Sequence, residues 1–169
     1  MKLILAIMTL VLFSISAIAQ NSVDVSSKAP KSVDFGLMGG LNLSFFNVTE
    51  GQFGTYQDVQ VNFYGGVFVD FNIVNHFHFQ PELLYIGLGD FRFLNVPLYL
   101  KYNIYTNFDF MVGPSINYFF DFFSKKIKIH VDLSLAYNIS SSLNIHMKYT
   151  IGFQQISPSG LFLGVGYKI

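Results

Sequence analysis

Residues 127–137 have the sequence IKIHVDLSLAY, in which every second residue is a large apolar one. Lysine, histidine, aspartate, serine and alanine lie between them, so the two sets fall on opposite faces of an extended chain. The same period of two occurs in LNIHMKYTIGF at 143–153 and in LFLGVGYKI at 161–169. A helix would scatter these charged and apolar side chains over all of its sides. The three stretches therefore predict β-strands with one apolar face.

The alternation extends back along the chain to Phe35. It predicts five more strands, over Phe35–Phe46, Gln60–Phe71, Phe77–Gly87, Arg92–Tyr105 and Phe108–Phe119. Short turns are predicted at 72–76, 106–107 and 140–142, and longer polar loops at Asn47–Val59, 120–125 and 154–158, with a short link at 88–91 as the exception. Each strand is close to the ~9–11 residues that a tilted strand needs to cross a bilayer. Tight turns on one side and longer loops on the other are typical of outer-membrane barrels.

The composition argues against an ordinary soluble enzyme. Charged residues make up only 12% of the 169 residues, compared with roughly 25% in an average soluble domain. The mean hydropathy of +0.43 lies in the range of membrane proteins. Ten basic residues balance ten acidic ones, which leaves no positive excess for binding a nucleic acid. The absence of cysteine excludes disulfides, thiolate metal sites and cysteine nucleophiles.

The start of the chain has the pattern of an export signal. An apolar run over Leu3–Ile18 ends in Ala17-Ile18-Ala19, the small-x-small pattern that signal peptidase cleaves. We predict a signal peptide over residues 1–19, with a single transmembrane anchor as the alternative. The polar stretch at 20–34 predicts a flexible periplasmic leader, and residues 35–169 the barrel domain.

An exported and very apolar chain without a second long apolar segment is best explained by a closed barrel, in which every backbone group is paired. We therefore predict an all-β fold, an eight-stranded antiparallel transmembrane β-barrel with up-and-down meander topology in the bacterial outer membrane. Both chain ends are expected on the periplasmic side. The apolar strand faces are expected to contact lipid, flanked by two belts of aromatic residues. These are Phe71, Phe77, Tyr102, Phe108, Tyr137 and Tyr167 near the short turns and Phe45, Tyr85, Tyr118 and Phe153 near the loops.

Three prolines, Pro81, Pro97 and Pro114, fall inside predicted strands. Proline lacks the N–H that a paired strand donates, so bulges or local register breaks are expected there. The segments that contain them are FQPELLY at 79–85, NVPLYLKY at 95–102 and VGP at 112–114.

Together with FGLMGGLNLSFF at 35–46 and the closing LFLGVGYKI, these proline-containing segments resemble the PorT-like outer-membrane β-barrel family. The resemblance covers about residues 35–169. It implies a small outer-membrane barrel of Bacteroidetes-type bacteria, in a family whose founding member is linked to protein secretion and gliding. It implies no catalytic residues.

An eight-stranded barrel has an interior just wide enough for side chains to fill, so a closed lumen is expected. The predicted lumen network, which we interpret as structural, comprises Asp70, Glu82, Lys101, Asp109, His130, Asp132, His146, Lys148 and Lys168. A buried charge needs a partner. Asp132 and Lys148 lie about one diagonal step apart across the turn at 140–142, and we expect them to pair.

A catalytic role is the alternative that makes the more specific prediction. His130, Asp132 and Ser134 share one strand face and His146 follows on the next strand, which supplies the groups that nucleophilic catalysis uses. The histidines are spread from the middle of the barrel to its periplasmic end, however. His76 and His78 are two apart around a turn and could share a metal only if both pointed the same way, and two ligands without a nearby third are more often solvated turn residues. We predict no catalytic, cofactor-binding or metal site.

The loop at Asn47–Val59 is the longest predicted connection, and it contains Phe53 and Tyr56 among polar residues. We predict it as the candidate interaction surface for other envelope proteins, with a solvated loop without partner as the alternative. The expected function is a non-enzymatic structural or interaction role, with outer-membrane lipid as a partner and no nucleic acid. The alternatives are a barrel enzyme acting on lipid or peptide and a soluble periplasmic ligand-binding barrel.

Overall fold

The computed structural model describes residues 32–50, 54–87, 92–120, 126–152 and 158–169. The predicted signal peptide at 1–19 and nearly all of the leader at 20–34 lie outside these residues, and both stay predictions. Within the described ranges, no helix has the length and apolar character that would take it across a membrane.

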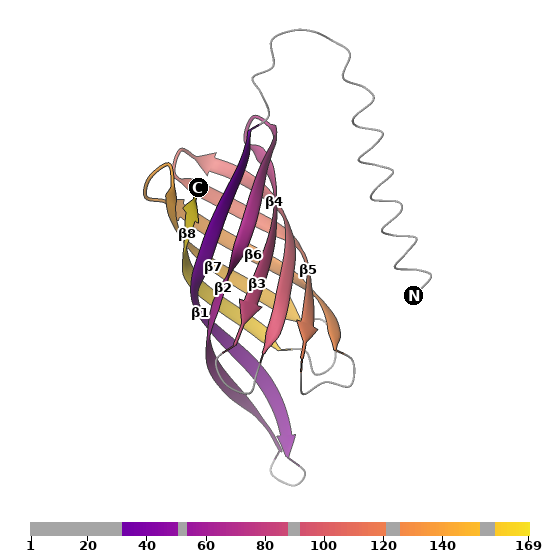
Figure 1. Cartoon of the computed structure of the whole chain (residues 1–169). Coiled ribbons are helices and arrows are strands. Elements are labelled where there is room, and N and C mark those ends of the chain that lie inside the picture. The colour runs from indigo at the N-terminus through magenta and orange to yellow at the C-terminus, as the bar shows by residue number, and fades with distance from the viewer. Residues whose placement is uncertain (1–31, 51–53, 88–91, 121–125, 153–157) are drawn as a thin grey trace, which may run out of the picture. The chain divides into compact units, whose positions relative to one another are not determined.

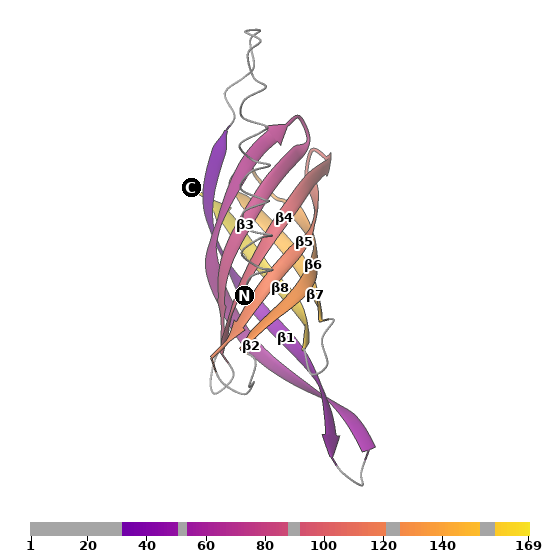
Figure 2. The same ribbon diagram turned by 90° about the vertical axis from the view of Figure 1, so that its right-hand side faces the viewer.

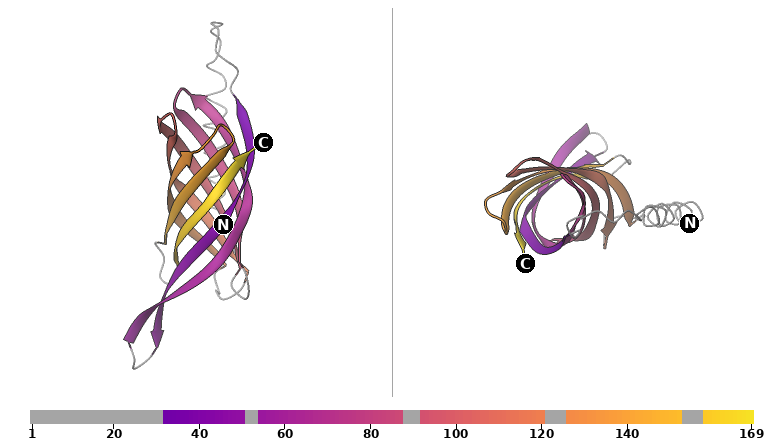
Figure 3. Two further views of the ribbon diagram at one scale, coloured as in Figure 1. Left: turned by 90° about the vertical axis from the view of Figure 1, so that its left-hand side faces the viewer. Right: turned by 90° about the horizontal axis from the view of Figure 1, so that it is seen from above.

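The described residues form eight antiparallel strands that close into a barrel in chain order (Figures 1 and 3). The strands are β1 (Val33–Glu50), β2 (Gly54–Val74), β3 (Phe77–Ile86), β4 (Phe93–Tyr105), β5 (Phe108–Phe119), β6 (Ile127–Asn138), β7 (Leu143–Gly152) and β8 (Ser159–Lys168). The barrel closes where β1 pairs with β8, from Gly36 opposite Lys168 to Phe45 opposite Ser159. The predicted eight-stranded meander is therefore confirmed.

The two faces of each strand differ as the alternation predicts. Along β6, Leu133 is 37% exposed on the outside, whereas the next residue, Ser134, is 2% exposed inside the barrel. Large apolar side chains make up most of the outer face, and the buried set includes asparagines, aspartates, lysines and histidines. The barrel is thus apolar outside and polar inside, the reverse of a soluble barrel.

Aromatic side chains pair on the outside near the short turns. The rings of Phe77 and Tyr102 lie 4.8 Å apart between centroids, and those of Phe108 and Tyr137 lie 4.9 Å apart. At the opposite end, Tyr118 packs edge-on against Phe120, with ring centroids 5.3 Å apart. Rings therefore gather near both ends of the barrel, although the predicted belt residue Phe153 lies outside the described residues.

The three strand prolines keep the register, so the prediction of bulges or register breaks at them is wrong. Register shifts occur instead beside short turns, at Asn72/Val74 and at Asn103/Tyr105. At each proline, the pairing with one of the two neighbouring strands lapses over two residues, one of which is the proline. The gaps lie at Val69–Asp70 opposite Gln80–Pro81, Glu82–Leu83 opposite Val96–Pro97, and Leu98–Tyr99 opposite Gly113–Pro114. Each proline removes one N–H donor from the ladder. The strand stays extended because the residues before and after each gap remain paired.

The predicted loop at Asn47–Val59 is wrong over most of its length, because its two arms pair as strands. β1 and β2 stay in register as far as Glu50 opposite Gly54. By contrast, β1 pairs with β8 only as far as Phe45, and β2 pairs with β3 only from Tyr64 onward. The two strands therefore continue beyond the barrel wall as a hairpin, at the end opposite the C-terminus (Figures 1 and 2).

Of the two aromatic residues predicted in this loop, Phe53 lies outside the described residues. Tyr56 belongs to β2, where its backbone lies opposite Val48 of β1. Valine, threonine and tyrosine favour strands; both arms contain valine and threonine, and the second also contains Tyr56, which explains why the polar stretch continues the sheet.

Candidate functional site

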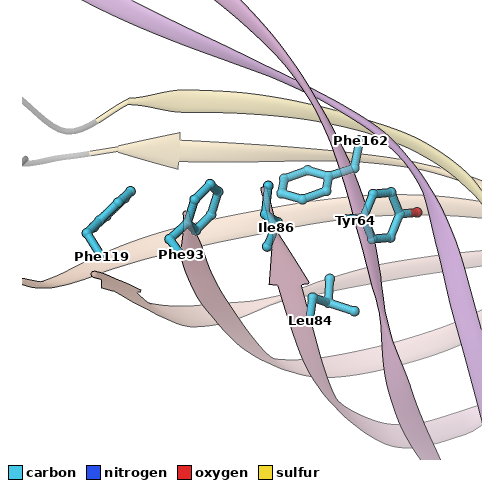
Figure 4. Packing of buried hydrophobic residues seen from close by; sticks show 6 residues of the cluster. All are labelled: Tyr64, Leu84, Ile86, Phe93, Phe119 and Phe162. Carbon is cyan, nitrogen blue, oxygen red and sulfur yellow. The ribbon is translucent and has the colours of Figure 1, made fainter. Parts of the chain in front are cut away.

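The lumen contains an apolar cluster at the end of the barrel from which the hairpin extends (Figure 4). Its buried members are Tyr64, Leu84, Ile86, Phe93, Phe119 and Phe162. The ring of Tyr64 packs edge-on against that of Phe162, with centroids 5.3 Å apart, and Phe93 stacks on Phe119 at 4.9 Å. The side chains come from β2, β3, β4, β5 and β8 and pack against one another inside the barrel.

A buried ion pair, Glu82–Lys148, spans the lumen. Lys148 Nζ on β7 donates to Glu82 Oε2 on β3 at 2.6 Å, and both side chains are 1% exposed. Gln80 Nε2 donates to the other oxygen of Glu82 at 2.9 Å. The ammonium group also lies 5.2 Å from the centroid of the Tyr99 ring, within the range of a cation–π contact. Lys148 is therefore held by a carboxylate and an aromatic face.

The predicted pairing of Asp132 with Lys148 is wrong. On the β6–β7 ladder, Lys148 lies opposite Ser134, and its side chain reaches across the lumen instead of along the wall. Asp132 accepts from neutral donors: Ser115 Oγ donates at 2.7 Å and the Tyr99 hydroxyl at 3.4 Å. The predicted diagonal placement of Asp132 and Lys148 is confirmed, but hydroxyl donors and the Asn95 amide, at 3.5 Å, replace the expected direct contact with the ammonium group.

A second charged cluster lies toward the short turns, centred on Asp70. Lys101 Nζ donates to Asp70 at 2.6 Å, and His78 Nδ1 lies 2.7 Å from the other carboxylate oxygen. Lys101 also lies 3.4 Å from Asp109, and Lys168 lies 3.9 Å from Asp70. Alternating charges therefore cross-link β2, β3, β4, β5 and β8.

The histidines of the proposed catalytic set bond to other partners. His146 Nε2 bonds with the Tyr64 hydroxyl across the lumen, and His130 Nδ1 bonds with the Asn117 amide. Ser134 Oγ has no hydrogen-bond partner among the described residues. No hydroxyl–imidazole–carboxylate arrangement is therefore assembled from these residues.

The two histidines considered for a metal point to different environments. His76 is exposed and lies against the ring of Tyr102, whereas His78 turns inward to Asp70. Across the described ranges, no three His, Asp or Glu side chains are placed to share a metal ion.

All nine predicted lumen residues face the barrel interior, but several of their partners were not predicted from the sequence, among them two tyrosines. Tyr64 and Tyr99, buried on the lumen side, supply the hydroxyls that bond His146 and Asp132. Their position in the period of two, on the same strand faces as Asn62 and Asn95, is the signal that could have identified them.

The lumen has little free space. One interior cavity lies beside Glu82, Lys101 and Asp109, a second lies beside Asn42 and Asn117, and each has a volume of about 10 Å³. Such a volume is at the limit of what a single water molecule needs, about 10–15 Å³. At these two places, the described side chains leave room for about one water molecule.

Close packing beside Gly164 predicts a measurable defect for Gly164→Ala. An added Cβ would lie 2.1 Å from the Tyr64 hydroxyl and 2.5 Å from the backbone oxygen of Gly39. Displacing Tyr64 also breaks its bond to His146, and we expect the free energy of unfolding to fall by about 1–3 kcal/mol. Gly65→Ala is the control, because its Cβ would meet nothing closer than 3.9 Å. Equal losses in urea unfolding of the two variants would contradict this packing.

Comparison with known proteins supports the fold. Residues 18–89 match a family described as outer membrane protein beta-barrel domain. No curated protein matches the chain. The chain is structurally similar to small outer-membrane barrels, and the shared fold is a closed eight-stranded antiparallel barrel.

Among these structures is Ail, the attachment invasion locus protein of Yersinia pestis, in complex with a heparin analogue. The two chains are 12% identical, with a TM-score of 0.54 over 82% of this chain and 99% of Ail. Neisserial surface protein A is 12% identical, with a TM-score of 0.50 over 82% of this chain and 100% of that one. A de novo designed transmembrane β-barrel is 15% identical, with a TM-score of 0.51 over 86% and 100%. At these identities the likeness establishes the fold alone.

Proposed function

We propose that this protein is a non-enzymatic barrel of the bacterial outer membrane, with a sealed lumen and a structural or interaction role. The observation that supports this most is the reversed polarity of the wall. Exposed leucines, isoleucines and aromatic residues cover the outside, while Glu82 and Lys148 are paired inside. Such a surface is stable in hydrocarbon and would aggregate in water.

Two further observations support a role without transport or catalysis. The two interior cavities among the described residues have volumes of about 10 Å³, which is too small for a solute larger than water. The lumen histidines His146 and His130 bond to Tyr64 and Asn117. The β1–β2 hairpin then remains as the part of the barrel that extends past its wall. We place the start of β1, at residue 33, and the end of β8, at residue 168, on the periplasmic side. The hairpin extends from the opposite end of the barrel and therefore faces the cell exterior, where it can meet other molecules.

Refolding the chain into lipid vesicles tests this proposal. We expect the vesicle-bound chain to show β-sheet circular dichroism and to migrate differently on SDS gels before and after boiling, because the closed barrel resists the detergent. In planar bilayers, it should give no steady ionic current, because the lumen is filled. A chain that stays soluble without detergent would contradict the membrane location. A steady current would contradict the sealed lumen.

A further inference from the structure

The β1–β2 hairpin has a free strand edge, and the backbone hydrogen bonds show which groups lie on it. Gly87 N–H donates to the carbonyl of Phe63 at 3.0 Å, so the backbone groups of Phe63 point toward β3. The N–H and C=O of a strand residue point to the same side, and this side alternates along the strand. The backbone groups of Val61 and Val59 therefore point the same way. Pairing between β2 and β3 ends at Tyr64, so no described strand pairs with either valine on this side.

The edge is unsuited to lipid. Unpaired backbone N–H and C=O groups are not tolerated in the hydrocarbon region, because water cannot reach them there. The side chains of Val59 and Val61 are 47% and 62% exposed, and the stretch from Thr55 to Asn62 contains no proline and no lysine. Natural proteins use proline and lysine to block strand edges from pairing with other chains. The edge over residues 55–62 has neither.

The charges of the hairpin indicate the kind of partner. The hairpin carries Glu50 and Asp58, and the sequence has no lysine or arginine between Ser32 and Phe91. A second copy of the chain carries the same negative charges, so charge complementarity does not favour it as the partner. A positively charged strand would be attracted instead.

We infer that the free edge of β2 over residues 55–62 binds an extended, positively charged polypeptide segment of another protein as an added strand. Strand addition of this kind takes its affinity from main-chain hydrogen bonds and its selectivity from alternate side chains. The inference rests on the proposed function, which places the hairpin in water on the outside of the membrane.

The test uses the full chain in nanodiscs of zwitterionic lipid and two synthetic peptides. One peptide alternates lysine with valine, and the other alternates glutamate with valine. We expect the lysine peptide to bind, and its affinity to fall as salt is added because the attraction is screened. The glutamate peptide should bind at least about tenfold more weakly, a difference of about 1.4 kcal/mol.

Val59→Pro isolates the strand edge from the rest of the surface. It removes one N–H that faces the free edge, whereas the β1–β2 ladder uses the groups of the neighbouring residues. We expect the affinity for the lysine peptide to fall about tenfold, in line with the loss of a backbone hydrogen bond. Val59→Thr keeps the N–H and the branched side chain, and it should bind like the natural chain.

A second variant covers the case in which the proline impairs folding. Replacing residues 46–58 by an asparagine–glycine turn joins Phe45 to Val59, which are opposite each other in the β1–β2 register. Such a turn closes a two-residue hairpin. This variant should keep the mobility shift on SDS gels and bind the lysine peptide more weakly, because only residues 59–62 of the proposed edge remain.

The possible outcomes separate the two proposals. Equal binding of the lysine peptide to the natural chain and to the shortened hairpin would overturn the inference, as would no binding to an inserted natural chain. Dimers that disappear when the hairpin is shortened would also overturn it, because a second copy would then occupy the edge. A chain that fails to insert into lipid would overturn the proposed function itself.

Discussion

Replacing Lys148 by methionine is expected to lower the free energy of unfolding by about 3–5 kcal/mol, because it leaves the carboxylate of Glu82 as an unpaired buried charge. Both side chains of the Glu82–Lys148 pair are 1% exposed, so water cannot replace the lost ammonium group. Methionine has a similar volume, which keeps the packing against Tyr99 and Phe162. Urea unfolding in detergent or lipid measures the loss.

A double-mutant cycle then shows which carboxylate Lys148 pairs with. Combining Lys148→Met with Glu82→Gln should cost clearly less than the sum of the two single changes, since neither charge is then left without its partner. The matched cycle of Lys148→Met with Asp132→Asn should be much closer to additive, because Asp132 accepts from Ser115 and Tyr99. A larger coupling for Asp132 than for Glu82 would contradict the structure and restore the pairing along the wall.

Leu133→Arg is expected to cost about 2–4 kcal/mol when the barrel is folded in a bilayer, the range for arginine at the membrane midplane. Leu133 lies in the middle of β6, and its side chain is 37% exposed on the outer face. The arginine would have to remain in hydrocarbon or thin the bilayer around it. Unfolding in lipid vesicles measures the effect.

Ile127→Arg is the control for this experiment. Ile127 is on the same strand and the same outer face, but at the end of β6. The cost of arginine falls to about 0–1 kcal/mol near the membrane interface. Ile127→Arg should therefore lower the free energy of unfolding less than Leu133→Arg does. Equal costs at both positions would mean that the outer face does not cross a bilayer.

The strands could be predicted from the sequence because a single property repeats along them. The predicted strand at Phe108–Phe119 has the bounds that the structure shows for β5. Its side chains alternate between exposed and lumen-facing positions, and a short turn precedes it. The hairpin continues beyond the closed barrel, so neither of its faces lines the lumen. The alternation of apolar and polar residues therefore weakens there. Polar residues there appeared to form a loop, although the backbone pairs through Glu50 opposite Gly54.

The partners inside the lumen could not be predicted for a different reason. The faces of Glu82, Asp132 and Lys148 follow from the period of two, but their partners depend on distances across the barrel. Glu82 and Lys148 are 66 residues apart, on strands that are not neighbours. Counting from a turn compares adjacent strands only, and so it favoured Asp132. The stagger of the strands and the width of the lumen decide such contacts.

The pairing of β1 with β8 makes the order of synthesis matter. Gly36 lies opposite Lys168, so the first strand waits for its second neighbour until nearly the whole chain has been made. Such a distant contact makes closure slow, since a long loop must close before any bond is gained. A chain that stops before Ser159 leaves both β1 and β7 with an unpaired edge. An unfinished chain therefore exposes two rows of backbone N–H and C=O groups that the closed barrel does not have.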